Sequence, residues 1–141
     1  MKRSIIFIIL ALFIFNFNPL KAQSDELVNT CALNIGNATY LKDFKIKLQS
    51  SNVNPPSVKF SVVLNKGTIY QLNVCESPDY PGKAVIQLLD NNQVIGSNMK
   101  ADGSLLKGII AQIQKTGVYN IVVSFKDGKE GAAAVILSFM K

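Results

Sequence analysis

The sequence contains no histidine and no tryptophan, and its only arginine is Arg3. Histidine is the commonest general base in enzymes and the usual partner of a serine or cysteine nucleophile, so its absence disfavours catalysis. Two cysteines without any histidine also fall short of the four nitrogen or sulfur ligands that structural zinc prefers. We therefore expect a protein that is not an enzyme and has no such metal centre.

Two weaker catalytic patterns are present, and neither changes this expectation. The S-x-x-K matches at Ser97–Lys100 and Ser104–Lys107 lack the helical context and the partner motifs that such a nucleophile needs. A pair of carboxylates could serve glycoside hydrolysis, but the available acids lie in predicted turns or loops, where acids usually serve solvation. Those acids are Glu76, Asp79, Asp90, Asp102, Asp127 and Glu130.

The first 22 residues have the three-part composition of a secretory signal peptide. Lys2 and Arg3 precede an unbroken apolar run at 5–15, and a more polar segment ends at the small residue Ala22. The apolar run of eleven residues is well short of the ~20 that a membrane-spanning helix requires. We expect cleavage between Ala22 and Gln23, no membrane span afterwards, and export to the periplasm or the extracellular space.

Residues 23–141 form one domain's worth of chain, with a modest positive charge. Three of the 15 basic residues belong to the signal segment, which leaves twelve against nine acidic residues. The remaining lysines are scattered and no arginine accompanies them, whereas nucleic-acid binding usually needs a concentrated basic face. We expect no nucleic-acid partner.

Cys31 and Cys75 are the only cysteines. An even number in an exported chain favours a disulfide, and the alternative is two buried free thiols. A bridge would tie the N-terminal segment to the end of a core strand.

Alternation of apolar and polar residues predicts a series of strands. Residues 58–64 and 70–74 each place apolar side chains on one face, and Asn65-Lys66-Gly67 separates them. Asparagine and glycine tolerate the positive φ that tight turns need, so we predict a β-hairpin across Val58–Cys75. For the polar segment 23–30 we expect a helical turn or a first edge strand.

Further strands are predicted from Thr39 onward, at 84–90, at 93–97, around 109–113, at 118–125 and at 132–140. Proline and glycine clusters mark the loops at 49–57 and 76–83. Seven to nine strands separated by turns indicate an all-β, antiparallel, jelly-roll-like sandwich in a single domain spanning 23–141. The alanines at 132–134 favour a strand over a helix, because Gly131 precedes them and β-branched residues follow.

Candidate binding residues lie in the predicted loops. Tyr80, next to Asp79, is the tyrosine we expect to be exposed, where its ring could stack on a sugar or on a partner's apolar patch. Alternatively, the ring folds back on the prolines of its own loop. Oxygens near Asp90, Asn91, Asn92 and Asp102 could hold Ca²⁺, but the spacing of a known calcium loop is missing, and ordinary turn chemistry is the simpler explanation of these residues. We expect no other cofactor.

Residues 59–140 resemble the bacterial pre-peptidase C-terminal (PPC) domain. The resemblance rests on KFSVVLNKGTIYQLNV, AVIQLLDNNQVIG and IIAQIQKTGVYNIVVSF, and the last segment contains a T-G-x-Y element at Thr116–Tyr119. This resemblance implies a jelly-roll-like fold without catalytic residues and an accessory role in secretion, adhesion or partner contact. We expect no protease ahead of the domain, and the Cys31 segment lies outside the family's pattern.

The sequence thus predicts an exported, non-enzymatic binding module whose partner is another exported or envelope protein or a surface glycan. A small subunit of a larger envelope or secretion complex and a carbohydrate-binding module are the alternatives. The lack of tryptophan, the usual sugar platform, weighs against the last of these.

Overall fold

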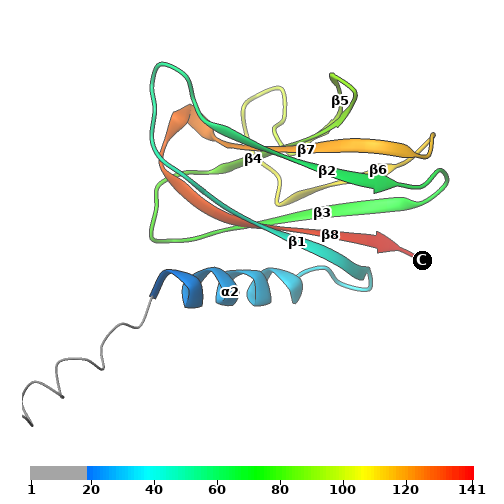
Figure 1. The fold of residues 1–141 in the computed structure, drawn as a ribbon, viewed down its shortest axis with the longest axis horizontal. Coiled ribbons are helices and arrows are strands. Elements are labelled where there is room, and N and C mark those ends of the chain that lie inside the picture. The colour runs from blue at the N-terminus through cyan, green and yellow to red at the C-terminus, as the bar shows by residue number, and fades with distance from the viewer. Residues whose placement is uncertain (1–18) are drawn as a thin grey trace, which may run out of the picture.

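The computed structural model describes residues 19–141, and it consists of two antiparallel sheets packed face to face with one helix on the outside (Figure 1). Eight strands form the two sheets, which confirms the predicted all-β sandwich. Residues 1–18, most of the predicted signal peptide, lie outside the described part of the chain.

The strand order is that of a jelly roll. The first sheet has the order β1-β8-β3-β6 and the second the order β2-β7-β4-β5. Consecutive strands lie in opposite sheets except β4 and β5, which form a hairpin. The strands are β1 (Thr39–Leu48), β2 (Ser57–Leu64), β3 (Ile69–Glu76), β4 (Ala84–Asp90), β5 (Gln93–Ser97), β6 (Gly108–Gln112), β7 (Gly117–Phe125) and β8 (Gly131–Met140).

The predicted hairpin across Val58–Cys75 is wrong. Strand β2 pairs with β7, whereas β3 pairs with β8 and β6, so the turn at 65–68 carries the chain from one sheet to the other. The turn chemistry itself is as expected, because Gly67 has a φ of +83°. Alternation shows which face of a strand is buried, but both strands here face the same core from opposite sheets, and alternation does not identify hydrogen-bonding partners.

The core lies between the two sheets and is made by the predicted apolar faces. In β7 every second residue is buried, at Tyr119, Ile121, Val123 and Phe125, as the alternation predicts. The Tyr119 hydroxyl donates a hydrogen bond to the Lys115 carbonyl 2.5 Å away, which satisfies its one polar atom inside the apolar core.

Strand β8 is buried on both of its faces. Val135 and Leu137 point into the core, while Ala134 and Ile136 lie beneath the helix α2 (Pro19–Ala32). For 23–30 the sequence predicted a helical turn or an edge strand, and the structure has a helix there. This helix, α2, is longer than a single turn, because it has 14 residues and includes the bond at which cleavage is predicted. Its apolar residues at 27, 28, 31 and 32 have the spacing of one helical face and pack on the first sheet.

A disulfide joins this helix to the sheet. Cys31, near the end of α2, is bonded to Cys75 of β3, with the two Cα atoms 5.6 Å apart. This separation lies within the usual range of disulfide bridges. The pairing holds α2 against the outer face of the first sheet. Within residues 19–141 no helix is both long enough and apolar enough to cross a membrane.

Candidate functional site

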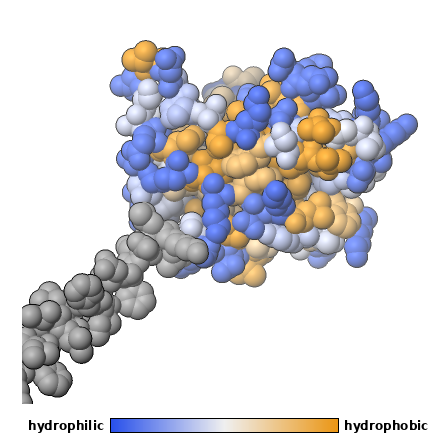
Figure 2. Space-filling view, viewed as in Figure 1, coloured by the Kyte–Doolittle hydropathy of each residue, from blue (hydrophilic) through white to orange (hydrophobic). Residues whose placement is uncertain are grey.

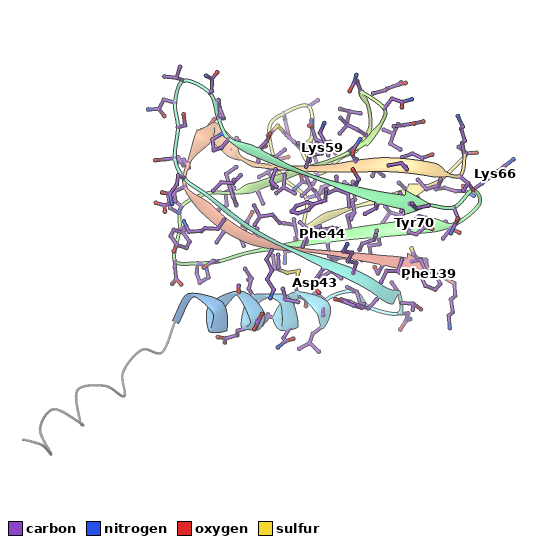
Figure 3. The ribbon with its side chains drawn as sticks, viewed as in Figure 1. Asp43, Phe44, Lys59, Lys66, Tyr70 and Phe139 are labelled. Carbon is purple, nitrogen blue, oxygen red and sulfur yellow. A yellow bond between two sulfur atoms is a disulfide. The ribbon has the colours of Figure 1, made fainter. Side chains whose placement is uncertain are left out.

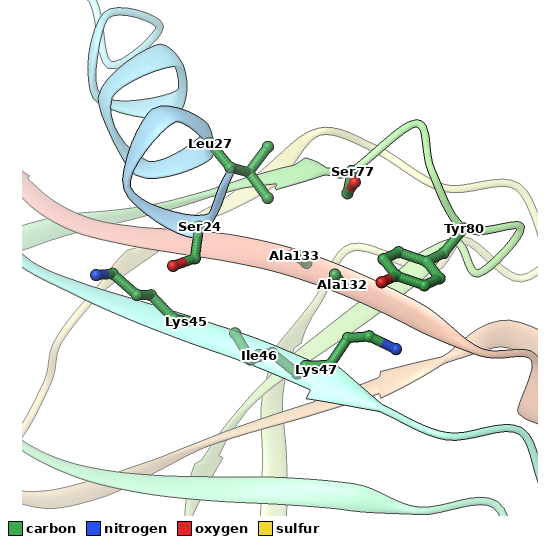
Figure 4. Close-up of a pocket in the computed structure, with 9 residues that line it drawn as sticks. All are labelled: Ser24, Leu27, Lys45, Ile46, Lys47, Ser77, Tyr80, Ala132 and Ala133. Atoms are coloured by element: carbon green, nitrogen blue, oxygen red, sulfur yellow. The ribbon is translucent and has the colours of Figure 1, made fainter. Parts of the chain in front are cut away.

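A groove of about 340 Å³ lies on the outer face of the first sheet, between the start of α2 and the loop that joins β3 to β4 (Figure 4). We call it the Tyr80 groove. Its lining residues are Ser24, Leu27, Lys45, Ile46, Lys47, Ser77, Tyr80, Ala132 and Ala133. Leu27 and Tyr80 stand on opposite sides of the small residues of β8 (Figure 4). These alanines leave the space that larger side chains would fill.

Backbone contacts hold the Tyr80 loop in place. The Ser77 N–H donates to the Ala132 carbonyl at 2.8 Å, and the Gly82 N–H donates to the Glu130 carbonyl at 2.8 Å. A Cβ atom at Gly82 would lie only 2.6 Å from that carbonyl oxygen, so the loop can approach this closely only with glycine. The loop is therefore fixed at both ends, with Tyr80 between its anchors.

The Tyr80 ring is half-buried and carries a cation on its face. The Lys47 ammonium lies 3.9 Å from the ring centroid, within the range of a cation–π interaction. The same ammonium is 2.7 Å from Glu130 Oε1. The ring therefore has a defined position as a wall of the groove, and it is neither fully exposed nor fully buried.

The second lysine of the groove is also paired. Lys45 bonds to Asp25 of α2, and this contact raises the pKa of Lys45, chiefly through the side-chain hydrogen bond. Both ion pairs of the groove are partly exposed, and pairs of this kind contribute little to the stability of a fold. Their effect is to hold the lysine stems along the groove wall.

Asp79, predicted with Tyr80, is exposed and lies outside the set of groove-lining residues. Its backbone N–H donates to Ser77 Oγ at 3.3 Å, a local turn contact.

The structure does not bring the other predicted binding residues together. Asp90, Asn91 and Asn92 form the β4–β5 turn, where Asp90 pairs with Tyr119 at the start of β7. Asp102 lies near the opposite end of β7, because Lys126 donates to the carbonyl of the adjacent Gly103. The length of β4 separates the two places, about 20 Å at ~3.4 Å per residue. The structure therefore does not bring Asp102 together with the Asp90 turn, and within 19–141 no three Cys, Asp or Glu residues are grouped to hold a metal.

Asp102 instead organises its own turn. Its carboxylate accepts hydrogen bonds from the Ser104 hydroxyl at 2.6 Å and the Ser104 N–H at 2.9 Å. These bonds lower the pKa of the Asp102 carboxyl, the hydroxyl bond most of all. This is the turn chemistry that the sequence offered as the simpler explanation.

The Tyr80 groove offers burial of apolar surface next to an aromatic ring. Its lining residues supply three hydroxyls, those of Ser24, Ser77 and Tyr80, and two paired ammonium groups, and none of them carries a carboxylate or an amide side chain. Such a surface suits an apolar side chain presented by another molecule.

Sequence reasoning found Tyr80 but missed the rest of the groove. Leu27, Lys47 and Ala132 come from three elements that only the tertiary structure places side by side. One signal in the sequence could have indicated the wall formed by α2. The apolar residues at 27, 28, 31 and 32 have helical spacing, which is typical of a helix that packs its apolar face on the rest of the fold.

Comparison with known proteins gives a likeness of fold. No protein-family model and no curated protein sequence matches this chain. Among solved structures, it is similar to PliG of Aeromonas hydrophila, a periplasmic inhibitor of g-type lysozyme. The TM-score is 0.53 at 14% sequence identity, over 72% of this chain and 88% of PliG. At this identity the likeness shows that the two chains share a fold.

Proposed function

We propose that this chain is an exported, non-enzymatic module that binds another protein, and that the Tyr80 groove receives an apolar side chain of that protein. The observation that carries the proposal is the composition of the groove, in which a positioned aromatic ring faces leucine and alanine side chains. Aromatic anchors in preformed pockets dominate the energetics of protein interfaces.

The same composition favours a protein over a glycan. A sugar presents several hydroxyl groups, and a site for it needs convergent hydrogen-bonding groups of defined direction. The groove offers only the hydroxyls of Ser24, Ser77 and Tyr80 as neutral polar groups, and both of its lysines already have acidic partners. An apolar protein side chain would leave fewer polar groups without partners.

Three features support a role outside the cytoplasm. They are the signal-like segment at 1–22, the Cys31–Cys75 disulfide and the shared fold with a periplasmic protein. Structural disulfides persist mainly in oxidising compartments.

A narrower function, inhibition of an exported enzyme, is favoured by the fold likeness to PliG. We propose g-type lysozyme as the first enzyme to test. A turbidity assay on cell walls should show slower lysis when the purified protein is added. Full lysis at a molar excess of the protein would exclude inhibition of g-type lysozyme and leave the broader proposal in place.

Membership of the PPC family and the role of a small envelope-complex subunit are further proposals. The jelly-roll topology and the Thr116–Tyr119 turn and strand support the first of these. The subunit role would also use the Tyr80 groove, and a fixed stoichiometry with membrane proteins would distinguish it from a freely diffusing module.

Affinity capture with a matched control tests the broader proposal. The wild-type protein should retain a specific protein from the periplasmic or secreted fraction, and Tyr80→Ala should lose it. Tyr40→Ala is the control, because Tyr40 is also a partly exposed tyrosine, bonded to Asp43 and outside the groove. The captured protein must then rebind in purified form with defined stoichiometry. Equal retention by wild type and Tyr80→Ala would contradict the proposed site.

A further inference from the structure

A second cavity, of about 470 Å³, lies where β3 continues beyond its pairing with β6. We call it the lysine pocket, and it shares no lining residue with the Tyr80 groove. Its lining residues are Val74, Cys75, Glu76, Lys83, Gly103, Ser104, Leu105, Leu106, Lys107 and Lys126.

Three lysines reach this pocket from three separate segments. Lys83 ends the β3–β4 loop, Lys107 precedes β6, and Lys126 begins the short 3-10 helix η1 (Lys126–Gly128). Their backbones are fixed to neighbouring strands. The Lys126 N–H donates to the Lys83 carbonyl at 2.9 Å, and the Val74 N–H donates to the Lys107 carbonyl at 2.9 Å. The three cationic residues are therefore gathered by the fold.

The acids nearby leave this positive charge incompletely neutralised. Glu76 is the one acidic residue among the lining residues, and its Oε1 accepts the Ala84 N–H at 2.8 Å. Its Oε2 lies 3.5 Å from the Lys83 ammonium, a long contact. Asp102, close to Lys126, accepts both hydrogen bonds from Ser104. Three lysines thus face two carboxylates that already have other donors.

Two of the lysines have no direct carboxylate partner within the described chain. Lys126, half-buried, donates to the carbonyl oxygen of Gly103 at 2.8 Å, which is a neutral acceptor. Lys107 is exposed, and within residues 19–141 it forms no ion pair. The ammonium groups of Lys107 and Lys126 can therefore bind an anion without first breaking an ion pair.

We propose that the lysine pocket binds a small oxyanion, either phosphate or carboxylate, carried by a molecule or polymer of the compartment in which the protein works. Hydrogen bonds from ammonium groups to such oxygens are charge-assisted and about twice as strong as neutral ones. The pocket volume falls within the range of small-molecule sites. Val74, Leu105 and Leu106 supply apolar walls for the carbon skeleton attached to the anion.

Amide NMR titration of the purified protein tests this site independently of the Tyr80 groove. Inorganic phosphate is the first probe, malonate the carboxylate probe, and a glycerol phosphate polymer tests whether the anion is polymer-borne. Sodium chloride at matched ionic strength corrects for screening. We expect saturable shifts centred on residues 103–107 and on Lys83 and Lys126. The probe that binds with the highest affinity identifies whether the anion is a free phosphate, a carboxylate or part of a polymer.

Matched lysine variants separate a site from general surface charge. Lys107→Met should weaken the binding at least about fivefold, the loss expected for one charge-assisted contact. Lys66→Met is the control, because Lys66 is an exposed lysine in the β2–β3 turn and lies outside the pocket (Figure 3). Lys107→Met with the amide spectrum of the folded protein but unchanged affinity would overturn the proposal. So would the absence of saturation with all three probes, or equal weakening by both variants.

Discussion

At the scale of single residues, Asn98 joins three separate segments inside the protein. Its side-chain oxygen accepts the Ile86 N–H at 2.8 Å, and its amide nitrogen donates to the carbonyls of Ala84 and Leu106, each at 3.0 Å. Asn98 is 1% exposed. Nothing in the sequence indicated this burial, because an asparagine next to a turn is usually exposed.

Replacing Asn98 with alanine should destabilise the fold strongly. The change removes the partner of a buried N–H, of the buried Ala84 carbonyl and of the partly buried Leu106 carbonyl, which costs about 3 kcal/mol of unfolding free energy. Chemical denaturation followed by circular dichroism measures this cost. Asn92→Ala is the control, because Asn92 is exposed in the β4–β5 turn, and its change should stay within about 0.5 kcal/mol. Equal effects from the two variants would contradict the role of Asn98.

Ser104 should control the ionisation of Asp102. The two Ser104 hydrogen bonds favour the charged carboxylate and lower its pKa in the folded protein, so this contact stabilises the turn at neutral pH and is lost as the pH falls through the lowered pKa. In Ser104→Ala the hydroxyl bond is absent, and the Asp102 pKa should rise toward its ordinary value. Carboxyl NMR titration measures both variants. An unchanged pKa would show that the hydroxyl is not the main cause.

At the scale of elements, helix α2 depends on its disulfide. An isolated 14-residue helix is marginal in water, and α2 packs on the first sheet through a small cluster that includes Ala134 and Ile136. The Cys31–Cys75 bond closes a loop with a sequence separation of 44, worth about 4 kcal/mol in the chain-entropy description.

Replacing both cysteines with serine should loosen α2 before it unfolds the sheets. We expect a lower denaturation midpoint, a β-rich circular dichroism spectrum at room temperature, and early loss of hydrogen-exchange protection at 28–32. Asn29→Ala, on the exposed side of the same helix, is the control and should leave that protection unchanged. Retained protection of α2 in the double variant would show that packing alone holds the helix.

The elements also show how far the sequence could predict this fold. The strand positions, the apolar faces and the strand character of the alanines at 132–134 follow from alternation and turn chemistry, and the structure has them. Strand pairing was mispredicted at Val58–Cys75, because a jelly roll pairs strands that are distant in sequence. The Tyr80 groove was only partly predictable for the same reason, since its walls come from α2, β1 and β8.

At the scale of the whole molecule, the face seen in the space-filling view has apolar side chains lying among polar ones (Figure 2). The apolar lining of the Tyr80 groove stands out because it is concave and bordered by ion pairs. A preformed concavity of this kind binds with little ordering of its own groups. The proposed function therefore depends on position 80 more than on any other position in the chain.

Site-specific photocrosslinking in the exporting cell tests that position most directly. A benzophenone side chain placed at position 80 should form one discrete covalent adduct with another protein, because the groove wall would lie against the bound partner. The same photoreactive group at position 40, outside the groove, should not form this adduct. An adduct of the same mass from position 40, or none from position 80 in a correctly folded and exported protein, would contradict a protein-binding role for the Tyr80 groove.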